Sequence, residues 1–190
     1  SFEFTGELMA RILRDIFYKT FNVEEEIDED LFLATVRTFD RATDEGFGIR
    51  DRRDPEHDFY EQIRSNNEVF SAFRTHRMQN DIASQLLDGK GKLKPFYRFE
   101  EDVQRIIGTY NTAWLETEYD TAVIRAHQAA DWRVFERDGD ILPNLRWMPT
   151  TSAEPDPVHA QLWGIELTLP KGHRFWKSHR PGDRWNCKCS

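Results

Sequence analysis

Long apolar runs are missing from this sequence. None approaches the roughly 18 to 20 consecutive apolar residues that a membrane-spanning helix needs, and no positively charged and then apolar segment at the N-terminus is typical of a secretory signal. We therefore expect a soluble protein that stays inside the cell that makes it. The chain begins with Ser1 rather than Met, so we also expect that further residues precede it.

Cysteine is scarce, because the 190 residues include only Cys187 and Cys189. A disulfide across a single intervening residue is geometrically strained. The missing secretory signal favours a reducing compartment, in which disulfides are rare. Both points argue against a fold that is held together by disulfides.

The composition indicates a folded protein in spite of its polarity. Apolar residues make up 38% of the chain, charged residues 32% and aromatic residues 13%. So high an aromatic content argues against disorder. A chain of this length can form one domain, or a helical body with a small appendage, and we expect the second arrangement.

Charge is unevenly distributed along the chain. The formal net charge is −8, yet residues 171–190 contain six basic residues and the single acid Asp183, so this tail carries +5 and the remainder −13. A basic end on an acidic body suits contact with an anionic partner, such as nonspecific double-stranded DNA or an acidic protein face. The alternative is a solvated terminus. The basic residues are Lys171, Arg174, Lys177, Arg180, Arg184 and Lys188.

Helical periodicity predicts an N-terminal helical segment over residues 1–47. Apolar residues recur at helical spacing near 5–20 and again from about Asp28, a predicted N-cap. Gly46 and Gly48 are the predicted stop of the second helix.

A helical body is expected over residues 48–138. It begins with a charged linker and continues in helices, with Asn66-Asn67 as a candidate interruption. The longest periodic run, about 98–137, predicts one long helix or two helices broken near Gly108. Small residues such as Ala126 on this run would let another helix approach closely.

The last part of the chain, residues 139–190, is predicted to be a small module with α+β structure. Frequent prolines exclude long helices there, and residues 145–148 and 162–169 have the pattern of strands. So short a unit buries little core of its own, so it must pack on the long helix or be held by a metal or a crosslink. The predicted fold class is therefore mainly α with a small C-terminal α+β module.

The chemistry-bearing residues of this module suggest a zinc site. Thiolates and imidazoles are preferred zinc ligands, and a bound metal ion adds most to the stability of a small unit. The candidate ligands are Cys187, Cys189 and His159, with Asp156, His173 or His179 as the fourth.

Two other interpretations of the same residues stay open. In the first, His159 and the two cysteines only pack within the module and bind no metal, and Trp163, Trp176 and Trp185 provide most of its hydrophobic core. In the second, the chain is a zinc- or cysteine-dependent, hydrolase-like enzyme that uses His159, Cys187 and Cys189. The sequence identifies neither an orienting group nor an oxyanion hole, so we predict that the chain is not an enzyme and assign no catalytic residues.

Several spaced motifs resemble the phage Mu F-like minor head protein family, also called the phage head morphogenesis domain. That family's signature is a Thr-Glu element on a helix, a histidine shortly before a glycine, and a Pro-Pro-containing stretch ending in Asn-Cys-Arg-Cys. This sequence departs from it at Pro181-Gly182, where two prolines are usual, and at Lys188, where Arg is common. The matching residues are Thr117-Glu118, Thr150-Thr151-Ser152, Asp156, His159, Gly164, Phe175-Trp176, Pro181 and Asn186-Cys187-Lys188-Cys189.

The resemblance covers about residues 110–190 and implies a role in virus assembly. Proteins of this family are low-copy minor capsid components that associate with the portal vertex, enter the head during assembly and influence DNA packaging or delivery. The implied partners are portal and capsid proteins, and the implied locations are the cytoplasm of the bacterial host, where an active phage or a prophage is expressed, and then the virion head. Some relatives are joined to toxins, which implies a delivery domain as an alternative.

Overall fold

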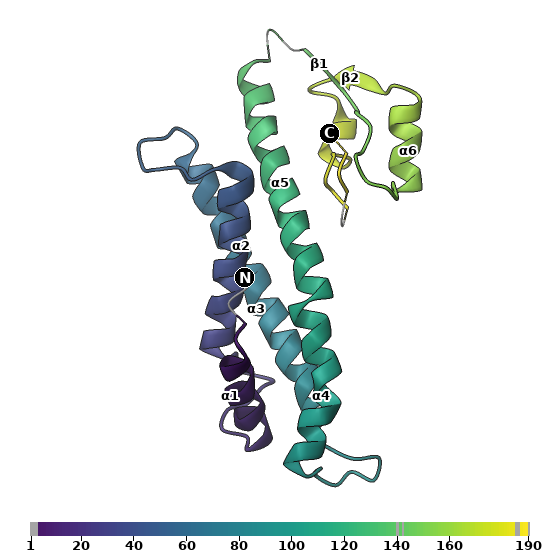
Figure 1. Cartoon of the computed structure of the whole chain (residues 1–190). Coiled ribbons are helices and arrows are strands. Elements are labelled where there is room, and N and C mark those ends of the chain that lie inside the picture. The colour runs from purple at the N-terminus through teal and green to yellow at the C-terminus, as the bar shows by residue number, and fades with distance from the viewer. Residues whose placement is uncertain (1–3, 140, 142, 185–186, 190) are drawn as a thin grey trace. The chain divides into compact units, whose positions relative to one another are not determined.

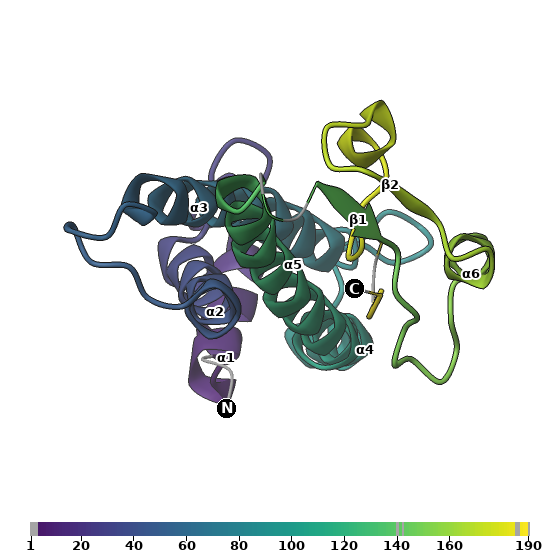
Figure 2. The same ribbon diagram turned by 90° about the horizontal axis from the view of Figure 1, so that it is seen from above.

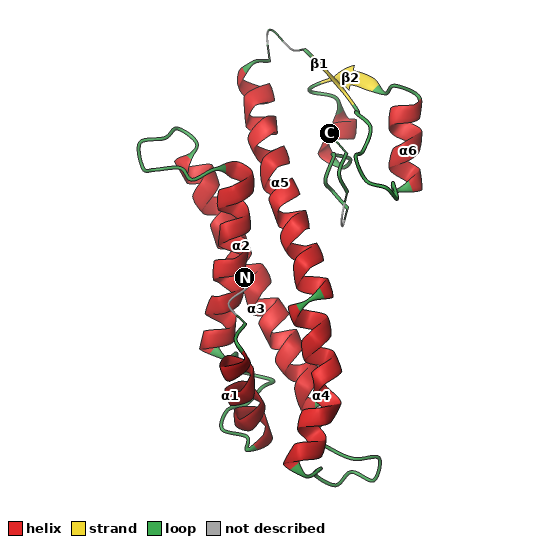
Figure 3. Cartoon of the chain, in the orientation of Figure 1, coloured by secondary structure: helices red, strands yellow, loops and turns green. Residues whose placement is uncertain are grey.

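A computed structural model describes residues 4–139, 141, 143–184 and 187–189 of the chain (Figure 1). The protein is mainly helical, and its two short strands lie near the C-terminus (Figure 3), as the sequence predicts. Contacts divide the chain into two compact units. Unit 1 comprises Ser1–Arg41 and Arg52–Glu116, and unit 2 comprises Ala42–Asp51 and Thr117–Ser190.

These units differ from the predicted ranges 1–47, 48–138 and 139–190. Two long helices, α2 (Glu29–Phe47) and α5 (Ala113–Arg137), each contribute to both units. Sequence periodicity detects where a helix begins and ends, but it does not show which of its turns pack with which neighbour.

The first two helices begin at side-chain caps, of which Asp28 was predicted from the sequence. The hydroxyl of Thr5 accepts a hydrogen bond from the Leu8 backbone N–H at 3.1 Å and starts α1 (Gly6–Phe17). Asp28 caps α2 in the same way, since its carboxylate accepts from the Leu31 N–H at 2.9 Å. Such caps satisfy backbone donors that the first helical turn leaves unpaired.

The end of α2 corrects the predicted role of one glycine. Gly46 lies inside the helix, whereas Gly48, with a φ of +82°, follows its last residue. A Cβ added at Gly46 would overlap with the Val123 carbonyl oxygen and lie 2.6 Å from the Ala126 Cβ. Gly46 therefore allows close approach of α2 and α5 within unit 2, on the small-residue face that was predicted around Ala126.

Helix α3 (His57–Ala83) is continuous through Asn66-Asn67, so the candidate interruption does not occur. Its buried face is unusually polar. Arg74, Thr75 and Gln79 are buried, while the side chain of Phe73 is 73% exposed. Arg74 donates to the Tyr110 carbonyl oxygen at 2.5 Å, and the Gln79 amide oxygen accepts from the Asp28 N–H at 3.2 Å.

The predicted long helix is two helices. Helix α4 (Phe96–Asn111) ends before Thr112, whose φ of −123° and ψ of −89° are not helical, and α5 begins at Ala113. The break therefore falls four residues after Gly108, which lies inside α4. The Thr112 hydroxyl donates to the Gly108 carbonyl oxygen. This bond satisfies one of the acceptors that the end of α4 would otherwise leave unpaired.

The core of unit 1 is built by α1, α2, α3 and α4, with α3 in contact with both α1 and α4. The Tyr110 hydroxyl donates to the Asp81 carboxylate at 2.5 Å and joins α4 to α3. The buried core residues are Met9, Ile12, Leu13, Ile16, Leu31, Met78, Ile82, Leu86, Phe99, Val103 and Tyr110.

The C-terminal part of unit 2 contains β1 (Asn144–Arg146), α6 (Pro157–Gly164), β2 (Thr168–Pro170) and the 3₁₀ turn η1 (Arg174–Lys177). Strands β1 and β2 lie side by side and antiparallel (Figure 2), and Leu145 faces Leu169 in their register. The predicted strand 162–169 is confirmed only at residues 168–169, because residues 162–164 belong to α6 and residues 165–167 are neither helix nor strand. The predicted strand 145–148 is confirmed at residues 145–146. The Asp156-Pro157 start signal of a helix overrides the apolar strand pattern at 162–164.

Among the described residues, no helix is both long enough and apolar enough to cross a membrane.

Candidate functional site

Three residues that are distant in the chain bring their metal-ligand atoms together in unit 2. The Nδ1 atom of His159 lies 3.2 Å from the Cys187 Sγ and 3.8 Å from the Cys189 Sγ. All three ligand atoms lie within 4.8 Å of one another, and all three residues are buried. The predicted set of His159, Cys187 and Cys189 is thus brought into one cluster.

Helix α6 positions His159 through its first turn. Asp156 is the N-cap, and its Oδ1 accepts hydrogen bonds from the backbone N–H groups of Val158 and His159 at 2.8 and 3.2 Å. Its second carboxylate oxygen lies 3.0 Å from the Arg184 guanidinium. These contacts hold the pKa of Asp156 below its ordinary value, with the His159 backbone hydrogen bond as the largest cause.

Asp183 is a member of the site that the sequence did not predict. Its Oδ1 lies 3.2 Å from the Nε2 of His159, on the opposite side of the ring from the sulfur atoms. The only available signal was that Asp183 is the single acid in a basic tail, which does not indicate a histidine partner 24 positions earlier. The structure thus supplies the orienting group that sequence reasoning could not identify.

Helix α5 fixes the turn that carries Asp183. Arg125 donates to the carbonyl oxygens of Gly182 and Asp183 at 3.1 and 3.2 Å, and Gln128 donates to that of Cys189 at 3.3 Å. Gly182 has a φ of +77°, a conformation that proline cannot adopt. A second proline at this position would therefore not fit the turn.

Aromatic rings surround the cluster. Trp147 lies with its ring centroid 5.0 Å from that of His159 and stacks on Trp176 at 6.1 Å. Burial, followed by the facing Cys187 side chain, raises the pKa of the Cys189 thiol to about 11, while Trp147 and Thr150 oppose this effect. The cluster is therefore a dry environment in which an uncompensated thiolate is unfavourable.

The three candidates for a fourth ligand are engaged elsewhere. Asp156 caps α6, as described above. His173 caps η1, where its Nδ1 accepts from the Phe175 N–H at 3.2 Å, and His179 stacks on the Phe175 ring with 4.6 Å between centroids. The structure brings none of them into the ligand cluster.

Half of the basic residues of the tail make contacts within unit 2. Lys171 donates to the carbonyl oxygens of Phe135 and Glu136 at the end of α5, where a cation is favourable. Arg180 lies over the Trp132 ring at 4.3 Å, and Arg184 pairs with Asp156. The side chains of Arg174, Lys177 and Lys188 are exposed.

The remaining motif residues are placed as follows. Thr117 and Glu118 lie on α5, and Gly164 is the last residue of α6. Trp185 and Asn186 lie outside the described residues.

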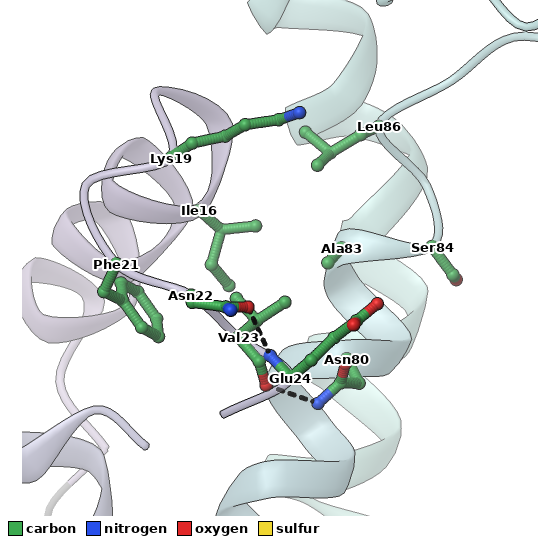
Figure 4. A pocket seen from close by; sticks show the side chains of 10 residues that line it. All are labelled: Ile16, Lys19, Phe21, Asn22, Val23, Glu24, Asn80, Ala83, Ser84 and Leu86. Atoms are coloured by element: carbon green, nitrogen blue, oxygen red, sulfur yellow. Dashed lines mark hydrogen bonds between the residues drawn. The ribbon is translucent and has the colours of Figure 1, made fainter. Parts of the chain in front are cut away.

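A pocket lies in unit 1, and none of the predicted site residues lines it (Figure 4). Its volume is about 700 Å³. Asn80 donates to the Val23 carbonyl oxygen at 2.7 Å, and Asn22 accepts from the Glu24 N–H at 3.1 Å. Its lining residues are Ile16, Lys19, Phe21, Asn22, Val23, Glu24, Asn80, Ala83, Ser84 and Leu86.

Comparison of this chain with protein-family models, with curated proteins and with solved structures finds no match. The resemblance to the Mu F-like family therefore depends on the motif residues alone.

Proposed function

We propose that this chain is a minor head protein of the phage Mu F-like type, which acts at the portal vertex in head morphogenesis and in DNA packaging or delivery. The observation that carries the proposal is the convergence of the motif residues. His159 and Cys187 are separated by 28 positions, yet their side chains are 3.2 Å apart in a buried cluster. Three of the motif residues, His159, Cys187 and Cys189, thus share one cluster, and this supports the proposal.

The architecture is consistent with a structural role. Among the described residues, the cluster of His159, Cys187 and Cys189 is buried by aromatic side chains. A buried cluster stabilises a module more readily than it turns over a substrate. Unit 2 would then serve as the attachment module, and the helices of unit 1 would bind further partners.

Assembly in its native context tests this proposal. We expect the chain, expressed with the portal and capsid genes of its own genome, to co-purify with portal-containing heads at low copy number. Adjacent portal and terminase genes are the expected genomic context. Heads that assemble with wild-type stoichiometry and package DNA normally when the gene is deleted would overturn the proposal.

A cysteine-dependent hydrolase is the second candidate, because Cys187, His159 and Asp183 have the order of a nucleophile, a base and an orienting carboxylate. Burial argues against it, since the Cys187 side chain is 7% exposed and His159 is 2% exposed. A hydrolase predicts turnover of activated esters that is lost in Cys187→Ala and retained in Cys189→Ser. A head protein predicts no turnover in any variant.

A further inference from the structure

Two thiols in this structure face a single imidazole nitrogen. Both Sγ atoms approach the Nδ1 of His159, at 3.2 and 3.8 Å. A ring nitrogen has one hydrogen or one lone pair, so it can form one good hydrogen bond. One hydrogen bond to Nδ1 therefore accounts for only one of the two sulfur atoms that approach this nitrogen.

Asp183 determines which form of His159 faces the sulfur atoms. An ionised carboxylate only accepts hydrogen bonds, so the Asp183 Oδ1 at 3.2 Å favours a hydrogen on Nε2. In the neutral ring, Nδ1 then presents its lone pair to Cys187 and Cys189. A carboxylate behind a histidine orients metal-binding imidazoles in the same way.

We propose that His159, Cys187 and Cys189 bind a zinc ion, with Asp183 as the residue that positions His159. Two thiolates and an imidazole are ligands that zinc prefers. Their burial means that the bound ion is part of the folded structure of unit 2. The inference is independent of the proposed role in phage heads.

The surroundings of the cluster favour thiolates that are bound to a cation. Cys187 and Cys189 are both buried, and their Sγ atoms lie within 4.8 Å of each other and of the His159 Nδ1. A divalent cation between these atoms would compensate the charge of each thiolate.

The bound ion would join two segments of unit 2, α6 and the C-terminal residues. His159 belongs to α6, which precedes β2, and the cysteines lie near the end of the described chain. Arg125 and Gln128 of α5 hold the backbone on both sides of the cysteines. The zinc ion would thus fasten the C-terminal residues to α6, which accounts for the stability of a module with so small an apolar core.

Metal titration of the full chain tests the site. The chain is purified under reducing conditions, freed of metal by a chelator and titrated with Zn²⁺ and with Co²⁺ as a spectroscopic probe. We expect one ion per chain, release of thiol protons, and thiolate-to-cobalt charge-transfer absorption. A metal-free wild-type chain with both thiols reduced that binds neither ion would overturn the proposal.

The Zn²⁺ affinities of single-residue variants distinguish the metal ligands from residues that only lie near them. We expect Cys187→Ser and Cys189→Ser each to weaken Zn²⁺ binding more than about 100-fold, and Asp183→Asn to weaken it about 10- to 100-fold while it keeps the cobalt spectrum. The control is His173→Gln, a histidine of the same module outside the cluster, which should bind as the wild type does. Equal binding in Cys189→Ser and wild type would contradict the site.

Folding of the variants is checked without metal. Far-ultraviolet circular dichroism of each metal-free variant is compared with that of the metal-free wild type. If a serine variant fails to fold, the wild-type titration still decides whether the site binds zinc. Asp183→Asn, whose side chain keeps the size of aspartate, then decides whether Asp183 positions His159. Unchanged Zn²⁺ affinity in a folded Asp183→Asn would show that Asp183 does not position His159.

Discussion

Gln79 shows how a polar residue can hold the interior of this protein together. Its side chain is fully buried, its amide nitrogen donates to the carbonyl oxygens of Val23 and Glu26, and its amide oxygen accepts from the Asp28 N–H at 3.2 Å. One side chain thus satisfies three backbone groups of the segment that joins α1 to α2. Such groups must be paired when they leave water.

Replacement of Gln79 by Met should therefore be costly although the shape is nearly conserved. Gln79→Met leaves buried backbone groups unpaired, and we expect the free energy of unfolding to fall by about 2 to 3 kcal/mol. Urea unfolding followed by circular dichroism measures the change. The matched control is Gln62→Met on the exposed face of the same helix, which should change stability by less than about 0.5 kcal/mol. Equal losses in the two variants would contradict the assigned role.

Only those residues of the candidate site that belong to a rare residue type in this chain could be predicted from the sequence. Cys187 and Cys189 are the only cysteines and zinc prefers thiolates, so the cluster with His159 was predictable. Asp183 was not, because acids are common and the turn at Gly182 that presents it is fixed by contacts with α5. Gln79 was missed for a related reason: a polar residue in a helix is expected to face water, and its partners lie more than 50 positions away.

Close approach of two helices is the main feature at the scale of elements. Gly46 of α2 faces the backbone of α5 at Val123 and the side chain of Ala126 within unit 2. No Cβ fits there without displacement of backbone atoms. Packed interiors accommodate such displacement poorly.

We expect Gly46→Ala to destabilise the protein in spite of the better helix propensity of alanine. The added methyl group should cost about 1 to 3 kcal/mol through overpacking, measured by thermal unfolding. Gly108→Ala is the matched control, since Gly108 also lies inside a helix but a Cβ there meets nothing within 4 Å. It should stabilise α4 by about 0.5 to 1 kcal/mol. Stabilisation by both substitutions would contradict the close packing at Gly46.

The boundaries of helices were predicted correctly where the apolar periodicity and a capping residue indicate the same position. The start of α2 was predicted at Asp28, whose side chain caps it, whereas for α1 periodicity gave only the approximate start near residue 5. The break between α4 and α5 was misplaced because glycine was expected to mark it, whereas the chain bends at Thr112. The apolar run at 162–169 resembled a strand because eight residues are too few to separate a period of 2 from a period of 3.6.

At the scale of the whole molecule, the proposed zinc ion should stabilise unit 2 more than unit 1. Tryptophan fluorescence reports mainly on unit 2, because Trp132, Trp147, Trp163 and Trp176 belong to it and Trp114 to unit 1. With free Zn²⁺ at 100 times its Kd, we expect the fluorescence-detected Tm to rise by about 5 to 10 °C. Mg²⁺ should have no effect. An equal rise in Cys189→Ser would show that the ion stabilises the protein from another site.

The charge distribution limits how this chain could contact DNA. Lys171, Arg180 and Arg184 already contact carbonyl oxygens, an aromatic ring and a carboxylate, although Arg180 and Arg184 are exposed. Arg174, Lys177 and Lys188 are the exposed tail cations that take part in none of these contacts. The residues before the tail carry a net charge of −13 and repel phosphates, so DNA binding should depend on the tail.

We therefore expect weak, nonspecific DNA binding with a shallow salt dependence. Three phosphate contacts predict a slope of log K against log salt of about −3, and all six cations would give about −5. Fluorescence anisotropy with a short duplex at several salt concentrations measures the slope. Substitution of Arg174, Lys177 and Lys188 by Gln should abolish binding, because these are the cations whose counterion release would drive it. Binding that survives this triple substitution would place the DNA contact on another surface and remove the basic tail from the proposed packaging role.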